Sequence, residues 1–254
     1  MKRIIPHILL LLILFITSCS SESNTVTGAE NENNGAVGDS ANDLLSSSIY
    51  TKLIVEIAYV KDMQPSAQAI SNFTSFLESR LNKPQGIQII QKEITISNKT
   101  SYTINDVRSI ENTHRNQFNN ENEIAVFALF LDGAYSENTS NSSVLGVAHK
   151  NTSFVIFEET IQDLSSDPFS PSTSTIETTV INHEFGHILG LVNAGTPMQD
   201  NHQDTANGRH CTTESCLMYW RVETAQGALD MLSGGSIPNL DSFCLQDLKA
   251  NGGK

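Results

Sequence analysis

Residues 174–190 read STIETTVINHEFGHILG, and this stretch decides how the rest of the chain is interpreted. Ser174 and Glu177 have the spacing of a capping box, so a helix is predicted to begin with Ser174 as its N-cap. Gly190 stands where the end of a helix favours a residue that tolerates positive φ. An apolar face is formed by Ile176, Val180, Ile181, Ile188 and Leu189.

Within this predicted helix, His183 and His187 are four residues apart and project from the same face. Two imidazoles in this arrangement can bind one zinc ion at about 2.0–2.1 Å from each nitrogen. Glu184 is offset by about 100° from His183, which places it near the metal but off the row of ligands. There it can act as general base for a zinc-activated water. Gly186 costs the helix about 1 kcal/mol relative to alanine, and we expect close packing against the sheet to compensate.

A catalytic zinc needs a third protein ligand. His183, Glu184, His187 and Gly190 match the start of the HExxHxxGxxH motif, and the sequence here resembles the metzincin metallopeptidases. At the next position of the motif the chain has Asn193 instead of histidine. A neutral amide oxygen is a poor zinc ligand, so Asn193 is predicted to be a turn residue.

The third ligand is indicated by the residues that follow the HExxH motif, around a candidate methionine turn. Residues 216–219 (CLMY) resemble a methionine turn, and His210 precedes Met218 by eight residues, the separation found in matrixins. Residues 210–218 (HCTTESCLM) also resemble the HC-x4-C-x-M signature of archaemetzincins. The resemblance implies that His210 is the third zinc ligand, that an insertion over 193–209 precedes it, and that Met218 forms an apolar floor beneath the metal.

His202, within the insertion, is the alternative third ligand, and Asn193 is the less favoured one. Tyr219 lies one residue too early to match the tyrosine ligand of astacins, so no metal role is predicted for it. His114 and His149 belong to no motif.

Cysteines recur in the C-terminal part, at Cys211, Cys216 and Cys244. In archaemetzincins the paired cysteines and a later CxxC bind a second zinc, but here Asp247 replaces the last cysteine. Because an exported compartment is oxidising, we expect a Cys211–Cys216 disulfide. A second, structural zinc with a Cys3Asp ligand set is the less favoured alternative, and Cys244 alone could simply be buried in the last helix.

The N-terminus indicates export. Lys2 and Arg3 precede an apolar run over 8–15 that is too short to span a bilayer comfortably, and the run leads into Cys19. This pattern resembles the lipobox of bacterial lipoproteins, which implies lipidation of Cys19, whereas the alternative is an ordinary signal peptide with an incidental cysteine. Ser20 follows where an inner-membrane retention signal would place Asp, so anchoring to the outer membrane is expected, on either its periplasmic or its cell-surface side.

Three regions are predicted: a signal peptide over 1–19, a flexible tether over 20–48 and a catalytic domain over 49–254. The tether is rich in Ser, Asn, Gly, Glu and Asp. Strands are predicted over 53–60, 86–96, 124–131, 144–148 and 153–157, and helices over 67–81, 103–118, 174–190 and 238–249. This order predicts one α/β (α+β) domain with a mixed twisted sheet. The resemblance to metzincins implies that it is of zincin type, with an active-site helix and a C-terminal helix. By the same resemblance, the strand at 144–148 stands where metzincins have the edge strand that pairs with an extended substrate, so it is the candidate for that role.

The formal net charge of −13 over 254 residues argues against nucleic acid or an anionic membrane surface as the main partner. The HExxH motif and the metzincin resemblance lead us to expect a zinc metalloendopeptidase that acts on a protein or peptide substrate. We also expect it to be monomeric and to contact the membrane only through its lipid anchor. The alternatives are a surface binding module with a non-catalytic zinc, and a zinc-dependent hydrolase of a non-protein amide.

Overall fold

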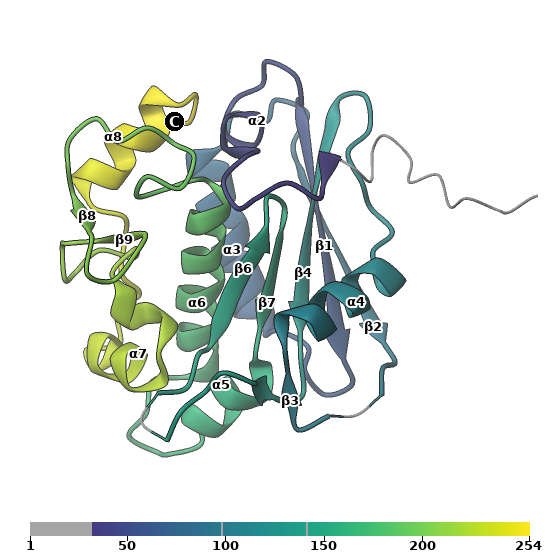
Figure 1. The fold of residues 1–254 in the computed structure, drawn as a ribbon, viewed down its shortest axis with the longest axis vertical. Coiled ribbons are helices and arrows are strands. Elements are labelled where there is room, and N and C mark those ends of the chain that lie inside the picture. Colours follow the sequence, from purple (N-terminus) through teal and green to yellow (C-terminus); the bar gives the residue numbers. More distant parts are fainter. Residues whose placement is uncertain (1–31, 98, 141) are drawn as a thin grey trace, which may run out of the picture.

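The computed structural model describes residues 32–254 except 98 and 141 (Figure 1). The predicted signal peptide, with Cys19, lies outside these residues. In chain order the elements are α2 (Ala41–Leu45), β1 (Lys52–Val60), α3 (Ala67–Arg80), β2 (Ile87–Ile94), β3 (Ser101–Tyr102), α4 (Ile104–His114), β4 (Glu123–Phe130), β5 (Ala134–Tyr135), β6 (Gly146–Lys150), β7 (Ser153–Ile156), α5 (Glu158–Leu164), α6 (Thr173–Ile188), β8 (Gln203–Asp204), β9 (His210–Cys211), the 3-10 helix η1 (Trp220–Glu223), α7 (Ala225–Leu232) and α8 (Ser242–Ala250).

A five-stranded sheet in the order β2-β1-β4-β7-β6 forms the centre of the domain. The first four strands are parallel, and β6 runs antiparallel to β7 at the edge. Helices α3 and α6 pack on one face of the sheet and α4 covers the other (Figure 1). Because both faces are covered, β1 and β4 are buried almost throughout, which explains their uninterrupted apolar sequences. The predicted fold class, a mixed α/β sheet with an active-site helix and a C-terminal helix, is confirmed.

The helix that carries the HExxH motif is α6, and it begins earlier than predicted. Ser172 is the N-cap, and its hydroxyl accepts a hydrogen bond from the Thr175 amide at 3.2 Å. The predicted cap at Ser174 is wrong because the Glu177 carboxylate is engaged elsewhere. It accepts hydrogen bonds from the amide (3.0 Å) and the hydroxyl of Ser66, the N-cap of α3. Glu177 therefore joins the two helices that cover this face of the sheet.

The chain from residue 33 to residue 45, here called the N-terminal strap, belongs to the folded domain. Leu44 and Leu45 of α2 are fully buried in the core. The Lys83 ammonium donates to the carbonyls of Asp43 (2.6 Å) and Tyr50 (2.7 Å), which anchors the end of the strap. The predicted tether over 20–48 is therefore wrong for the strap, and the predicted domain start at 49 is too late. The tether's first part, 20–31, lies outside the described residues.

Within the described part of the chain, no helix combines the length and the apolar character needed to cross a bilayer.

Candidate metal centres

Three imidazoles converge at the C-terminal half of α6. His183 and His187 come from successive turns of the helix, and their Nε2 atoms are 3.1 Å apart. His210 comes from β9, and its ring lies 5.4 Å from that of His183 and 5.0 Å from that of His187 between centroids. All three are buried. We call His183, His187 and His210 the histidine centre. The structure thus brings together the two helix histidines and the third residue that the methionine-turn spacing indicated.

Backbone carbonyls orient two of these rings. His183 Nδ1 lies 2.7 Å from the Leu217 carbonyl, and His210 Nδ1 lies 2.6 Å from the Asn207 carbonyl. A carbonyl can only accept, so each of these two Nδ1 atoms carries a proton, and each Nε2 faces the centre. Burial lowers the pKa of His187 to about 4, so this ring is neutral at pH 7. Burial also opposes protonation of His210, but the Glu223 carboxylate outweighs it and raises the pKa of His210. Neutral imidazoles held in this way are the form that binds zinc.

Glu223, at the end of η1, places a carboxylate oxygen among the three rings. Its Oε1 is 3.0 Å from His210 Nε2, 3.1 Å from His187 Nε2 and 3.4 Å from His183 Nε2. Burial raises the pKa of Glu223, but hydrogen bonds from the imidazoles outweigh it and hold this pKa well below its usual range. Sequence reasoning missed Glu223 because it belongs to no motif; it lies five residues after Met218, on the loop that returns from the turn.

The Glu184 side chain is held against the edge strand β6. Its Oε2 accepts a hydrogen bond from the Ala148 amide at 2.7 Å, while Oε1 is buried without a partner. Burial and the nearby negative charge of Glu223 raise the pKa of Glu184 well above its usual value. Gly146 makes room for this carboxylate, because a Cβ there would lie 2.8 Å from Glu184 Cγ. The candidate edge strand therefore positions the candidate base.

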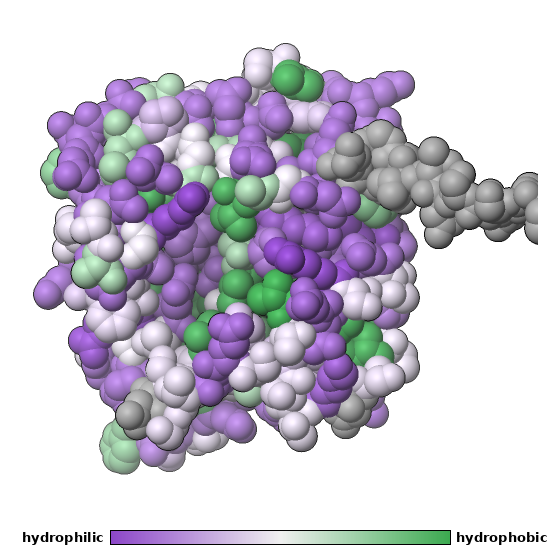
Figure 2. Space-filling model, in the orientation of Figure 1, coloured by the Kyte–Doolittle hydropathy of each residue, from purple (hydrophilic) through white to green (hydrophobic). Residues whose placement is uncertain are grey.

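A cleft gives access to this side of the histidine centre. It has a volume of about 440 Å³, and Glu184, His187 and Glu223 line it together with Val147 and Arg209. Figure 2 shows apolar side chains gathered in the middle of this face, where the surface is hollowed. Such a cleft, mostly apolar with a few polar groups that converge, is typical of a ligand-binding site.

Met218 lies beneath α6. A Cβ at Gly186 would lie 2.4 Å from Met218 Sδ, so the absence of a side chain at Gly186 lets the methionine pack under the turn between His183 and His187. The expected compensation for Gly186 thus comes from contact with Met218 and not with the sheet. Gly190, which follows α6, has φ +72°.

Asn193 takes no part in the histidine centre. Its side chain is exposed and donates to Gln203 Oε1 at 3.3 Å, and its φ is +62°, as in a turn. His202 is also elsewhere: its ring lies in a second group of potential metal ligands.

In this second group, the ligand atoms of His202, Cys211, Asp241 and Cys244 lie within 4.8 Å of one another. Cys216 adjoins it, and we call His202, Cys211, Cys216 and Cys244 the cysteine cluster. His202 Nδ1 lies 3.3 Å from Cys211 Sγ and 4.0 Å from Cys244 Sγ, and Cys216 Sγ lies 3.7 Å from Cys244 Sγ. The three thiols are free and fully buried. The predicted Cys211–Cys216 disulfide is therefore wrong: both sulfur atoms face the third cysteine and the histidine.

Two carboxylates border the cysteine cluster. Asp247 Oδ2 lies 2.8 Å from His202 Nε2, which leaves His202 Nδ1 to face the sulfur atoms. Asp241 Oδ2 lies 3.2 Å from Cys211 Sγ, and its Oδ1 caps α8 by accepting from the Cys244 amide. Hydrogen bonds from the Cys216 and Cys244 thiols lower the pKa of Cys211, which makes it the thiolate of the group. The Cys3Asp alternative made Asp247 the fourth ligand beside the three cysteines. In the structure the side chain that faces the cysteines is His202, and Asp247 contacts the opposite ring nitrogen of His202.

Comparison with solved structures finds a similar fold in the crystal structure of an archaemetzincin from Methanopyrus kandleri, determined at 1.5 Å resolution. The two chains are 17% identical, with a TM-score of 0.51, and the alignment covers 80% of this chain and 95% of that one. No family model matches the sequence, and a comparison with curated proteins finds no match. Since an identity this low supports a shared fold alone, the chain is a domain of archaemetzincin-like fold with two groups of candidate metal ligands.

Proposed function

We propose that the protein is a zinc-dependent endopeptidase, in which His183, His187 and His210 hold the zinc and Glu184 is the general base. The convergence of the three Nε2 atoms on one point, beside a buried carboxylate that faces the same cleft, carries the proposal. Three histidines with one side open to substrate are a ligand set of catalytic zinc sites.

The orphaned polar atoms of this site support the fit of a cation. Glu184 Oε1 is buried without a hydrogen-bond partner, and the buried His210 Nε2 has only the Glu223 carboxylate oxygen near it, at 3.0 Å. Glu223 Oε1 lies within 3.4 Å of all three Nε2 atoms. Three lone pairs and a carboxylate oxygen around one point repel one another unless protons or a metal ion lie between them. Glu223 is therefore a candidate for a fourth ligand that substrate or water displaces.

When bound, the zinc would polarise the scissile carbonyl and make a water more acidic. The chain's own residues supply the rest. The Ala148 amide holds Glu184 Oε2, which leaves Oε1 to accept a proton from the water and later to deliver it to the leaving amine. The Glu184 carboxylate lines the same cleft as His187, which is the placement that a base needs. Its burial also excludes competing solvent.

The cysteine cluster is proposed to hold a second zinc, with a structural role. Three thiolates and one imidazole form a Cys3His ligand set, which is common in closed structural zinc sites. Asp247, bound to the far nitrogen of His202, is the kind of outer carboxylate that orients a ligating histidine. A zinc there would brace the loop that carries both His210 and Met218.

A protein or peptide substrate, a monomeric state, export and lipid anchoring through Cys19 remain part of the proposal. The test is cleavage of casein and of capped peptides by the purified protein, with product termini read by mass spectrometry. We expect internal peptide bonds to be hydrolysed and a hydroxamate chelator to block the reaction. Hydrolysis of a cell-wall amide without cleavage of any peptide would contradict the peptidase proposal.

A further inference from the structure

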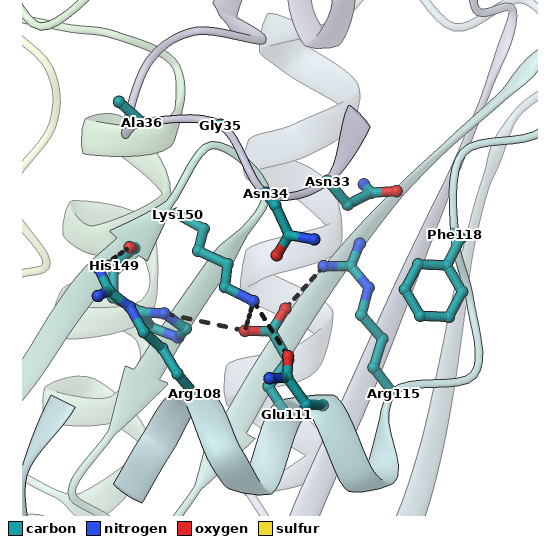
Figure 3. Close-up of a pocket in the computed structure, with 11 residues that line it drawn as sticks. Asn33, Asn34, Gly35, Ala36, Arg108, Glu111, Arg115, Phe118, His149 and Lys150 are labelled. Carbon is teal, nitrogen blue, oxygen red and sulfur yellow. Dashed lines mark hydrogen bonds and ion pairs between the residues drawn. The ribbon is translucent and has the colours of Figure 1, made fainter. Parts of the chain in front are cut away.

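A second cavity, of about 620 Å³, lies on the face of the sheet that α4 covers (Figure 3). Its walls are the first residues of the N-terminal strap (33–36), helix α4 and the end of strand β6. This volume lies within the range of pockets that bind small ligands or short peptide segments, about 300–1,000 Å³.

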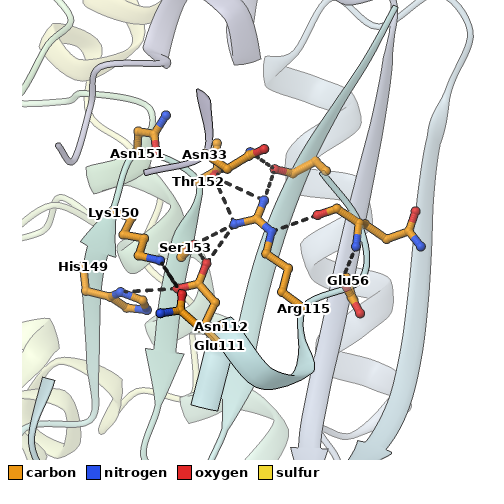
Figure 4. Close-up of polar contacts among 12 residues, drawn as sticks. Asn33, Glu56, Glu111, Asn112, Arg115, His149, Lys150, Asn151, Thr152 and Ser153 are labelled. Carbon is orange, nitrogen blue, oxygen red and sulfur yellow. Dashed lines mark hydrogen bonds and ion pairs between the residues drawn. The ribbon is translucent and has the colours of Figure 1, made fainter. Parts of the chain in front are cut away.

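Cations outnumber acids in this cavity. Arg108, Arg115 and Lys150 line it against a single carboxylate, Glu111. Glu111 forms ion pairs with Arg115 at 2.9 Å and with Lys150 at 3.1 Å (Figure 4). Arg108 is exposed, and the structure gives it one hydrogen bond, from Nη2 to the His149 carbonyl at 3.1 Å. A cationic cavity in a chain of net charge −13 indicates an anionic ligand.

His149 is the second observation that points to a ligand. Its residue is 6% exposed, it lines the cavity, and neither ring nitrogen has a hydrogen-bond partner. The nearest charged group is Glu111 Oε2, 3.9 Å from Nδ1. Burial lowers the pKa of His149 to about 4, so at pH 7 the neutral ring keeps one unmatched N–H donor. Buried polar atoms of this kind are costly unless a water or a ligand satisfies them.

The cavity lies next to the catalytic cleft. Ala36 of the strap lines both, and β6 passes from one to the other. The Ala148 amide holds Glu184, while His149 and Lys150, the next two residues, line the cavity. The pairing of β6 with β7 shifts register between Ala148 and Lys150, which is a β-bulge, so Lys150 lies at most about 7 Å along the strand from Ala148. An extended peptide beside β6 covers the same distance in two residues.

Building on the proposed peptidase function, we propose that this cavity is a specificity subsite that binds a carboxylate of the substrate, two or three residues from the scissile bond. Arg108, Lys150 and the His149 N–H donate to the carboxylate. The carboxylate can come from an Asp or Glu side chain or from the C-terminus of a peptide, and the experiment separates these sources.

The kinetic test uses peptides that are blocked at both ends. Each pair of peptides differs only by Glu or Gln at one position, and the pairs cover every position within four residues of the cleaved bond. We expect kcat/KM to favour Glu by about tenfold or more at one position, the worth of a charge-assisted hydrogen bond. Arg108→Gln should abolish this preference by lowering kcat/KM for the Glu peptide towards that for the Gln peptide, whereas Lys249→Gln, an exposed α8 control, should keep it. The same peptides with a free C-terminus test the alternative carboxylate source. No preference for any carboxylate, or a preference unchanged in Arg108→Gln, would overturn the proposal.

A binding test does not depend on peptidase activity. Histidine ring signals are followed by NMR while N-acetyl-glutamate amide or N-acetyl-glutamine amide is added, with His149→Gln used for assignment. We expect the His149 signal to move with the glutamate compound only, and not in Arg108→Gln. A signal that moves in a protein that cleaves no peptide would keep the carboxylate site and reject the peptidase function. A signal that does not move would reject the site.

Discussion

The histidine centre and the cysteine cluster are built side by side from the same short segments, yet they differ in their surroundings. Strand β9 contributes one residue to each: His210 to the first and Cys211 to the second, because successive residues of a strand point to opposite sides. The histidine centre borders a cleft and has two carboxylates, Glu184 and Glu223, beside it. The cysteine cluster is closed, with its thiols fully buried. This is the difference expected between a catalytic and a structural metal site.

Glu184→Gln should have the largest effect. It removes the base but keeps the shape and the hydrogen bond from Ala148, so we expect kcat to fall by about 10³-fold while zinc content stays unchanged. Cleavage of a capped peptide measures this, with the exposed Glu214→Gln as control. Turnover near that of the wild type would remove Glu184 from the mechanism.

His202→Ala tests the closed site. It deletes one ligand of the cysteine cluster and leaves Asp247 buried without its partner, so we expect a fall in Tm of about 10 °C. Thermal unfolding of the metal-loaded protein measures it, and His114→Ala, outside both groups, should change Tm little. If both variants had the wild-type Tm, the cluster would have no structural role.

Glu223→Gln tests whether the extra carboxylate of the histidine centre is a ligand. Replacing an anionic oxygen with an amide should weaken zinc binding there by about tenfold and leave the cysteine cluster unaffected. Competition with a chelator measures both affinities in one titration. An unchanged affinity at the histidine centre would show that Glu223 is not a ligand.

Glu158→Gln should have the smallest effect, and it concerns a carboxylate pair remote from both centres. Burial and the charge of Glu177 raise the pKa of Glu158 to about 9. A folded-state pKa above the unfolded value means that stability is full at acidic pH and is lost as pH rises towards 9. Glu158→Gln should therefore stabilise the protein at pH 8 by on the order of 1–2 kcal/mol and have little effect at pH 4. Urea unfolding at the two pH values measures the difference, and equal effects at both would contradict the raised pKa.

Sequence reasoning could locate the core of the histidine centre because its geometry is local. A four-residue spacing on a helix brings His183 and His187 together in any fold, and the methionine-turn resemblance added His210. The strands of the sheet were also predicted, since their apolar runs reflect burial on both faces. Expectations failed where long-range contacts decide: Glu177 bonds to Ser66, and Glu223 reaches the centre from a loop without a motif. The strap was read as a tether because polar composition hides the burial of Leu44 and Leu45.

The cysteines show the same limit. A short separation between Cys211 and Cys216 allows a disulfide, and sequence alone does not reveal that Cys244 and His202 face the same point. His202 was weighed as a ligand of the histidine centre, but its ring lies in the cysteine cluster, because the choice between two groups a few residues apart depends on which side of β9 a ring approaches. Only the packing of α8 against the loop decides this.

The most direct test of the account is zinc content by elemental analysis of the purified protein beside His210→Ala, Asn193→Ala and Cys244→Ser. Two zinc ions per chain are predicted for the wild type and for Asn193→Ala. One is predicted for His210→Ala, which retains the cysteine-bound zinc, and one for Cys244→Ser, which retains the histidine-bound zinc. A single zinc in the wild type that disappears only in His210→Ala would reject the cysteine cluster as a metal site. A chain that binds no zinc would contradict both.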